Sequence, residues 1–280
     1  MNKQQLENIW EQAKSIKEDE ALKWLVRQTH TRTNHARMLV GAEEGAFLEL
    51  FVEQVKAQKV LELGTFTGYS AIRLARGLQK NEESEKNEKD KVADFHVDAV
   101  EINDELEDLI REGFERAGVT NKIDLHFTDA KIFLKGLNEQ IKAVDKTVGN
   151  KKLYDIVFID ANKREYPAYY ELVFPLVKYG GYILADNVLW SGKLKEALQK
   201  REEKIGLAGV RQESGFVASG ISKAVLKPEI LHLDAQTSGI VEFYLTAKND
   251  QRVEFITLPI RDGLSIIRKS SSSIPIQTPA

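Results

Sequence analysis

Short apolar runs alternate with longer amphipathic stretches along the chain from about residue 42 onward. The apolar runs are typical of buried strands, and the amphipathic stretches have the period and length of helices. This alternation favours an α/β fold in which a parallel sheet is covered by helices on both faces. The predicted strands cover residues 59–64, 95–101, 122–128, 154–160 and 180–186.

Amphipathic helices are predicted between these strands, and their ends carry typical capping residues. Asn103 and Asp129 are expected N-caps, because a short polar side chain can accept a hydrogen bond from a free N–H group of the first turn. Gly118 and Gly180 are expected C-caps. The predicted helices cover residues 68–78, 103–118, 129–144 and 166–180.

The alternation changes near the C-terminus. A helix is predicted from Asp234 to about residue 249, and two strands follow within residues 252–260 and 263–269. Consecutive strands that lack a crossover helix pair in antiparallel fashion. We therefore expect a mostly parallel seven-stranded sheet with a terminal antiparallel strand pair at one edge.

Polar segments interrupt this scheme. Residues 79–91 form a charge run that is expected to be a solvated loop. Residues 195–232 form the largest segment predicted to be irregular, and we interpret this insertion either as a lid over the substrate or as a surface loop. We expect a single domain over residues 1–269, with N-terminal helices in residues 1–40 and a disordered tail at residues 270–280.

Composition argues against several classes of protein. The net charge of −3 gives no basic footprint for nucleic acid or an anionic membrane. No apolar run approaches the roughly 20 residues of a membrane span, and the charged N-terminus lacks the apolar segment of a signal peptide. The absence of cysteine favours a cytoplasmic location and excludes zinc–thiolate sites. Because the five histidines are scattered, a bound metal is expected to have oxygen ligands, which favours Mg or Ca over Zn.

A glycine-bearing turn joins the first predicted strand to its helix. Gly64 and Gly68 allow a ligand to approach the backbone closely, and the following helix presents free N–H groups. Glu62 lies among apolar neighbours at the end of the strand, where an amine or amide would satisfy it. The G-xxx-G spacing differs from the GxGxxG of dinucleotide binders, and any tight strand-to-helix turn can use such glycines.

The next two predicted strands also end in acidic residues. Glu101 ends the second strand, where many open α/β sheets hold the ribose of an adenosine, and Asp129 and Ala130 follow the third. Each acid alone is explained by a helix cap or a surface charge. Acids at three successive strand ends favour a nucleotide site, because ligands of open α/β sheets bind at the carboxyl ends of the strands.

A candidate metal site follows from the last two parallel strands. Asp160 ends the fourth predicted strand, and Asp186 and Asn187 end the fifth. Neighbouring strand ends lie roughly 5 Å apart in a parallel sheet, so these side chains can supply three oxygen ligands to a magnesium ion. The alternative is that Asp160 pairs with Lys163 and that Asp186 and Asn187 cap a turn.

Several segments of the chain are informative together: "RMLVGAEEGAFLELF", "VLELGTFTGYSA", "FIDANKREYPAYY", "ADNVLWSGK" and "DAQT" with "RVEFITLPIRDGLSIIRK". In this order they resemble the cation-dependent O-methyltransferases of the catechol and caffeoyl-coenzyme A type, in particular the bacterial-type branch. The resemblance covers residues 20–194 and 233–269, so residues 195–232 lie outside it. It implies a Rossmann-like S-adenosylmethionine (SAM) methyltransferase fold.

The resemblance also implies a chemistry. It implies SAM as the methyl donor, a divalent cation (Mg, with Ca or Mn as alternatives), a small phenolic substrate with vicinal hydroxyls, and a homodimer. Asn162 stands where the plant enzymes commonly have Asp, and Ser191 stands where they commonly have Asn. By position, the implied metal ligands are Asp160, Asp186 and Asn187, the implied general base is Lys163, and the implied SAM-binding residues are Val40, Glu62, Gly64, Thr65, Ser70, Glu101, Asp129, Ala130 and Asp160.

Two other functions are open on sequence alone. The first is a nicotinamide oxidoreductase, against which the glycine spacing and the terminal strand pair argue. The second is a SAM-binding protein without catalysis, against which the intact metal and base positions argue. Tyr69, Tyr166 and Trp190 are candidates to line a pocket, whereas Tyr169 and Tyr170 are predicted to pack in the core.

Overall fold

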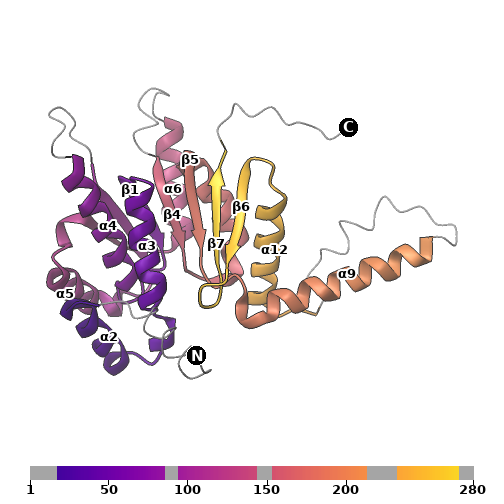
Figure 1. Cartoon of the computed structure of the whole chain (residues 1–280), viewed down its shortest axis with the longest axis horizontal. Coiled ribbons are helices and arrows are strands. Elements are labelled where there is room, and N and C mark those ends of the chain that lie inside the picture. The colour runs from indigo at the N-terminus through magenta and orange to yellow at the C-terminus, as the bar shows by residue number, and fades with distance from the viewer. Residues whose placement is uncertain (1–17, 86–93, 144–152, 213–231, 271–280) are drawn as a thin grey trace, which may run out of the picture. The chain divides into compact units, whose positions relative to one another are not determined.

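The computed structural model describes residues 18–85, 94–143, 153–212 and 232–270, and Figure 1 shows its helices and strands. The described strands form a seven-stranded sheet in the order β3-β2-β1-β4-β5-β7-β6. The chain divides into two compact units, Met1–Asp129 and Ala130–Ala280. No helix in the described ranges is both long and apolar enough to cross a membrane.

The first unit is built on three parallel strands, β1 (Lys59–Leu63), β2 (His96–Glu101) and β3 (Ile123–Phe127). Within this unit α3 packs against α4 and α2 packs against α5. Apolar strand residues such as Val60, Leu61 and Val97 are fully buried, and they form the core of the unit. The helices are α2 (Glu20–Arg32), α3 (Ala42–Gln54), α4 (Tyr69–Glu85) and α5 (Glu107–Ala117), with short 3-10 turns η1 (Ala36–Met38), η2 (Asp104–Leu106) and η3 (Thr120–Lys122).

The second unit contains β4 (Tyr154–Ile159) and β5 (Val177–Ala185), which pair in parallel. β7 (Leu264–Lys269) pairs antiparallel with both β5 and β6 (Val253–Leu258). α12 lies against α8, and Figure 1 shows α9 extending away from the strands of this unit. The helices are α6 (Ala130–Ala143), α8 (Tyr166–Val173), α9 (Lys193–Gln212) and α12 (Ala235–Asn249), with 3-10 turns η5 (Lys163–Glu165), η6 (Phe174–Leu176) and η7 (Trp190–Gly192).

The predicted α/β architecture is confirmed, including the antiparallel pair at the sheet edge. The predicted N-cap Asn103 is also confirmed, and so is the start of the last predicted helix at Asp234. The Asn103 side chain accepts a hydrogen bond from the backbone of Glu105, and the Asp234 side chain caps α12. Gly118 follows α5 in the left-handed conformation, with a φ of +67°, as a C-cap glycine does.

The prediction that Gly180 ends a helix is wrong. α8 already ends at Val173, and Gly180 lies inside β5 with a φ of +79°. Pro175 explains the early end, because a proline lacks the N–H group that the next helical turn requires. The pairing of β5 with β4 shifts register at this part of the strand, so the glycine accommodates an irregularity of the sheet.

The prediction that the charge run at residues 79–91 is a loop is wrong for its first half. α4 continues to Glu85, and residues 86–93 lie outside the described ranges. Asn81 is buried, and its side-chain amide donates to the carbonyl oxygens of Val52 and Ala57 at 3.0 and 2.9 Å. The polar side chain thus satisfies backbone groups at the end of α3, and this holds the helix against its neighbour.

The prediction that residues 195–232 are irregular is wrong up to Gln212, where α9 ends. The segment "KLKEALQKREEK" at its start is rich in strong helix formers, and these outweigh the glycines that follow. Residues 213–231 and the predicted disordered tail beyond Ser270 lie outside the described residues.

Candidate active site

The turn between β1 and α4 joins acidic residues from two strand ends of the first unit. Glu62 is fully buried, and its Oε2 accepts a hydrogen bond from the Thr65 hydroxyl at 2.9 Å. Glu101 Oε2 accepts a hydrogen bond from the N–H of Phe66 at 2.7 Å, and Oε1 accepts from the N–H groups of Ile102 and Asn103, both at 2.9 Å. Glu101 therefore ties the end of β2 to the glycine turn, and the backbone fixes the orientation of its carboxylate.

Both glycines of this turn are required by the backbone. Gly64 and Gly68 have φ values of +93° and +92°, which residues other than glycine rarely adopt. A Cβ atom at Gly68 would lie 2.7 Å from Cε1 of Phe114. The close packing of the start of α4 against α5 therefore explains why a glycine is needed at position 68.

The other predicted SAM-binding residues lie on different elements of the two units. Val40 is buried in the segment before α3, and Ser70 is buried in the first turn of α4. Asp129 ends the first unit, and the buried Ala130 begins α6 in the second unit. Of the predicted SAM-binding residues, Glu62 and Thr65 are hydrogen-bonded to each other, and Glu101 is hydrogen-bonded to the turn that contains Thr65.

In the second unit, the predicted metal ligands follow two paired strands. Ile159 of β4 pairs with Ala185 of β5, and the N–H of Asp186 donates to the carbonyl of Ile159 at 3.0 Å. The Asp186 side chain is buried and accepts a hydrogen bond from the N–H of Asn187 at 2.5 Å, and Asn187 has a φ of +57°. With Asp160, these side chains provide two carboxylates and an amide oxygen, and such an oxygen-only set fits a hard cation such as Mg²⁺.

Lys163 lies at the same strand end. Its Nζ donates to Asp160 Oδ1 at 2.5 Å and to the Tyr166 hydroxyl at 2.8 Å. The ion pair considered from the sequence is therefore present. The Lys163 and Asp160 side chains are 10% and 14% exposed, so Lys163 lies where it can act on a group that is bound at Asp160.

The role of Tyr166 is not evident from the sequence, which marked it only as a candidate to line a pocket. It is fully buried, and its hydroxyl lies 3.0 Å from the Ile159 carbonyl and 3.1 Å from the Asp186 carbonyl. Tyr166 thus joins the ends of β4 and β5 to Lys163. The only sequence signal is its position three residues after the lysine. Tyr169 and Tyr170 are buried, as predicted for core residues.

A second feature that the sequence did not predict is a set of hydrogen bonds between the loop after Asn187 and the β6–β7 turn. The N–H groups of Val188 and Leu189 donate to the carbonyls of Gly263 and Asp262 at 2.9 and 2.8 Å. The N–H of Ser191 donates to Asp262 Oδ1 at 2.5 Å. The turn therefore fixes the backbone that follows the candidate metal ligands.

The side chain of Trp190 is held by a hydrogen bond to α12. Its Nε1 donates to the Thr237 hydroxyl of α12 at 3.2 Å, and Thr237 in turn bonds to the Asp234 cap at 2.7 Å. Trp190 and Ser191 have φ values of +50° and +52°. The residues that follow the candidate metal ligands are thus held by contacts with α12 and with the β6–β7 turn.

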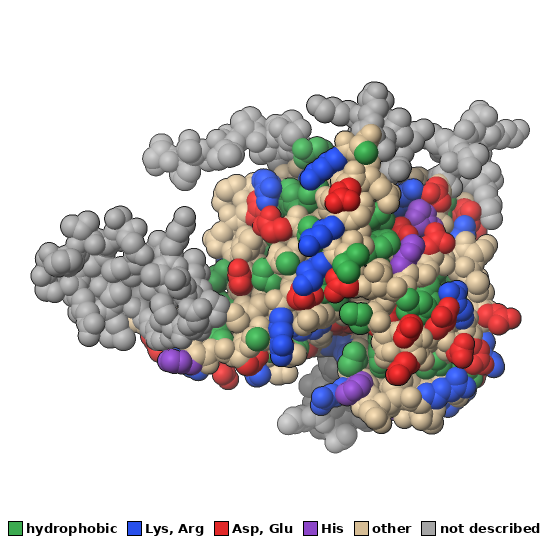
Figure 2. All heavy atoms as spheres, turned by 180° about the vertical axis from the view of Figure 1, so that it is seen from behind, with side chains coloured by type: hydrophobic (Ala, Val, Ile, Leu, Met, Phe, Trp, Pro, Cys, Tyr) green, Lys and Arg blue, Asp and Glu red, His purple; other side chains and the backbone are tan. Residues whose placement is uncertain are grey.

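The surface of the described residues carries both signs of charge. Figure 2 shows Lys and Arg side chains interspersed with Asp and Glu on the face seen from behind. This mixture agrees with the small net charge of −3. Exclusion of nucleic acid remains a prediction.

Comparisons with known proteins define the class. A family model described as O-methyltransferase matches residues 12–270. The chain is 30% identical over 254 residues to tapetum-specific methyltransferase 1 of Arabidopsis thaliana, covering 90% of this chain and 88% of that protein. It is 30% identical over 234 residues to caffeoyl-CoA O-methyltransferase 1 of the same plant, covering 84% of this chain and 72% of that protein.

Solved structures share the fold. The O-methyltransferase TomG from Streptomyces achromogenes, solved in complex with SAM, matches with a TM-score of 0.67 at 22% identity, covering 97% of this chain and 100% of TomG. An O-methyltransferase from Bacillus cereus, solved with SAH, matches with a TM-score of 0.63 at 24% identity, covering 91% of this chain and 93% of that chain.

The fold and the matches together define a methyltransferase of the α/β class. The chain belongs to the O-methyltransferase family. This confirms the resemblance seen in the sequence.

Proposed function

We propose that the protein transfers the methyl group of SAM to one hydroxyl of a small phenol with two vicinal hydroxyls, with a divalent cation at the end of β4 and β5. The observation that carries this proposal is that Asp160 and Asp186 directly follow the paired strand residues Ile159 and Ala185, with Lys163 hydrogen-bonded to Asp160. Family membership supports transfer to oxygen, and the SAM and SAH complexes of TomG and the Bacillus cereus enzyme support SAM as the donor.

In this proposal the residues of the first unit hold the donor. Glu101 offers a carboxylate of fixed orientation to the ribose hydroxyls, since its oxygens are already positioned by three backbone N–H groups. The glycine turn lets the ligand approach the backbone, and the hydrogen bond from Thr65 to Glu62 stabilises this turn.

The residues of the second unit act on the acceptor. A cation held by Asp160, Asp186 and Asn187 would bind both vicinal oxygens and lower the pKa of the one to be methylated. Lys163 would act as the general base that takes the proton from this hydroxyl, while Tyr166 holds the lysine in place. The phenol oxygen then forms a bond to the methyl carbon as the carbon–sulfur bond breaks. Alignment of these three atoms contributes about 7–11 kcal/mol.

The vicinal hydroxyls are tested by comparing catechol with phenol as acceptors at equal SAM concentration. Catechol is expected to be methylated at least about 10²-fold faster, because attachment through one oxygen does not fix the geometry of attack. The measurement is methylated product by mass spectrometry. Equal rates would contradict two-point chelation, and tight SAM binding without any turnover would favour a non-catalytic SAM-binding protein.

Substitution Lys163→Met tests the general base. The expected result is a fall in kcat of about 10²–10⁴-fold with little change in the KM for catechol, since the base acts on the proton in transit. Lys178→Met is the control, because Lys178 pairs with Asp155 at 2.7 Å away from the candidate site. If Lys163 served only as the partner of Asp160, the variant would lose stability in urea but keep kcat.

The oligomeric state and location are proposed on the resemblance and the composition alone. We propose a homodimer, which sedimentation velocity of the full chain tests, and a cytoplasmic location.

A further inference from the structure

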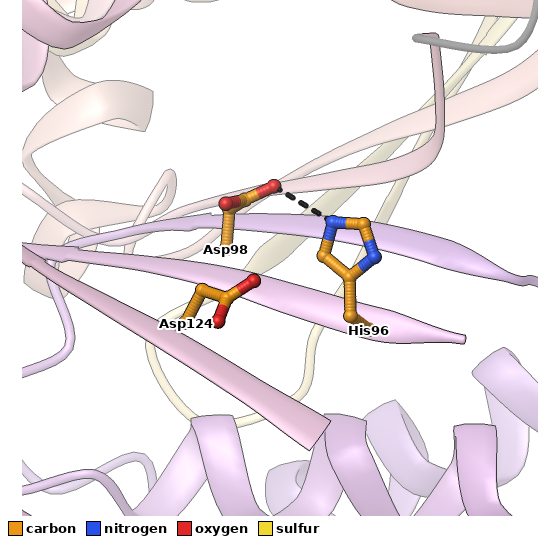
Figure 3. A group of neighbouring side chains, drawn as sticks. All are labelled: His96, Asp98 and Asp124. Atoms are coloured by element: carbon orange, nitrogen blue, oxygen red, sulfur yellow. Dashed lines mark hydrogen bonds and ion pairs between the residues drawn. The ribbon is translucent and has the colours of Figure 1, made fainter. Parts of the chain in front are cut away.

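A cluster of histidine and aspartate side chains lies on β2 and β3 of the first unit. His96 and Asp98 are two residues apart, so they share one face of β2, and Asp124 of β3 is in register with Asp98. One ligand atom from each of the three residues lies within 4.8 Å of the others. Figure 3 shows Asp98 and Asp124 side by side on neighbouring strands, with the His96 imidazole turned toward Asp98.

The spacing is close to that of a metal site. His96 Nε2 lies 3.1 Å from Asp98 Oδ2. A tetrahedral zinc ion with ligand bonds of about 2.0–2.2 Å holds its donor atoms about 3.4 Å apart. A metal ion between the imidazole and the carboxylates would therefore require the three side chains to move from separations of at most 4.8 Å to about 3.4 Å, and Asp124, which is exposed, has room to move.

The surroundings of His96 resemble the outer layer of a metal site. Its Nδ1 lies 3.0 Å from Asp94 Oδ1, and Lys59 Nζ pairs with the other oxygen of Asp94 at 2.8 Å. Histidines that bind metal usually hold a carboxylate at their second nitrogen, which fixes the ring and its tautomer. The interaction with Asp94 thus directs Nε2 of His96 toward Asp98 and Asp124.

The second oxygen of Asp98 is also positioned. His126 Nε2 lies 2.8 Å from Asp98 Oδ1, so Asp98 has an imidazole at each of its two oxygens. The Asp98 side chain is only 14% exposed. A mostly buried carboxylate between two imidazoles differs from an ordinary acidic surface patch, because nitrogen and oxygen atoms that can bind a metal lie next to one another.

We propose that His96, Asp98 and Asp124 bind a zinc ion, which ties β3, the first strand in the sheet order, to β2. One neutral imidazole and two carboxylates balance the charge of the ion and leave the fourth position to water. A mixed nitrogen and oxygen set suits zinc, whereas the oxygen-only set at Asp160 suits magnesium. The zinc site lies within the first unit and is independent of the proposed methyl transfer.

The test is a Zn²⁺ titration of the full chain with ¹⁵N-labelled histidine, followed by side-chain NMR in excess Mg²⁺. The hydrogen bond to Asp98 is the main cause that raises the pKa of His96, so a proton competes for the same nitrogen. The titration is therefore run at about pH 8, where this competition is weaker. The Nε2 signal of His96, assigned by its loss in His96→Gln, is expected to shift to the metal-bound position, while His30 and His35 do not change.

Variants separate metal binding from simple ion pairing. Asp124→Asn removes one exposed ligand and is expected to weaken zinc binding by more than tenfold with an unchanged circular dichroism spectrum. Asp94→Asn removes the outer partner and is expected to cost about 10–100-fold in affinity. Asp104→Asn, another exposed aspartate of this unit, is the control and is expected to bind zinc like the parent.

Two results would overturn the zinc site. One is a His96 signal that follows pH but ignores Zn²⁺, which would show that the cluster holds ion pairs only. The other is parent-like zinc affinity in both His96→Gln and Asp124→Asn. Neither outcome depends on methyltransferase activity.

Discussion

Substitution Asp186→Asn is expected to abolish methyl transfer while the fold stays intact. The side chain is buried at the end of β5 and accepts a hydrogen bond from the N–H of Asn187, which an asparagine oxygen can also accept. The substitution therefore removes the negative charge of the proposed ligand and keeps an oxygen that can accept this hydrogen bond. Loss of an outer partner of a metal ligand costs roughly 10–100-fold, so loss of a ligand itself should exceed that range. Catechol methylation and Mg²⁺ affinity are the quantities to measure.

Asp155→Asn is the matched control for this variant. Asp155 lies on the same pair of strands and pairs with Lys178, but it lies near the other end of β4. Its loss is expected to leave activity within a factor of a few. Full activity in Asp186→Asn, or equal losses in the two variants, would contradict the ligand assignment.

Substitution Gly263→Ala is expected to have a large effect on stability. A Cβ atom there would lie 2.3 Å from Cγ of Leu189 and 2.9 Å from its backbone nitrogen, and the φ is +93°. Overpacking costs about 1–3 kcal/mol, and a left-handed backbone at a non-glycine residue costs about 1–2 kcal/mol more. The clash displaces the loop that follows Asn187, so Mg²⁺ affinity should fall together with the free energy of unfolding in urea.

Gly180→Ala separates the clash from the backbone cost. Gly180 has a φ of +79°, and among the described residues no atom beyond its chain neighbours lies within 4 Å of an added Cβ. This variant should therefore lose only the roughly 1–2 kcal/mol of the backbone term and keep its Mg²⁺ affinity. Equal losses of stability in both variants would show that the clash of the added Cβ atom with Leu189 does not contribute.

The strands and the acidic residues at their ends were predictable from sequence for a physical reason. A buried strand such as β4 is an apolar run, here broken only by Asp155 near its start, so the aspartate that follows it at position 160 stands out. The same reasoning found Glu101 and Asp186. The final strand pair was predictable because no crossover helix separates β6 from β7.

The features that were missed depend on contacts between distant segments. Asn81 looks like part of a charge run, yet it is buried against the end of α3. Tyr166 and Asp262 support the candidate metal ligands through backbone hydrogen bonds that leave no spacing in the sequence. The histidines are scattered along the chain, but strand pairing brings His96 beside Asp124. Local patterns carry no information about such partners.

The central claim is methyl transfer from SAM at a metal site formed by Asp160, Asp186 and Asn187. It is tested most directly by measuring methylation of catechol by the full chain after treatment with a chelator and again after addition of Mg²⁺. Activity is expected to disappear with the chelator and to return with Mg²⁺. Turnover that continues unchanged in excess chelator would contradict the account.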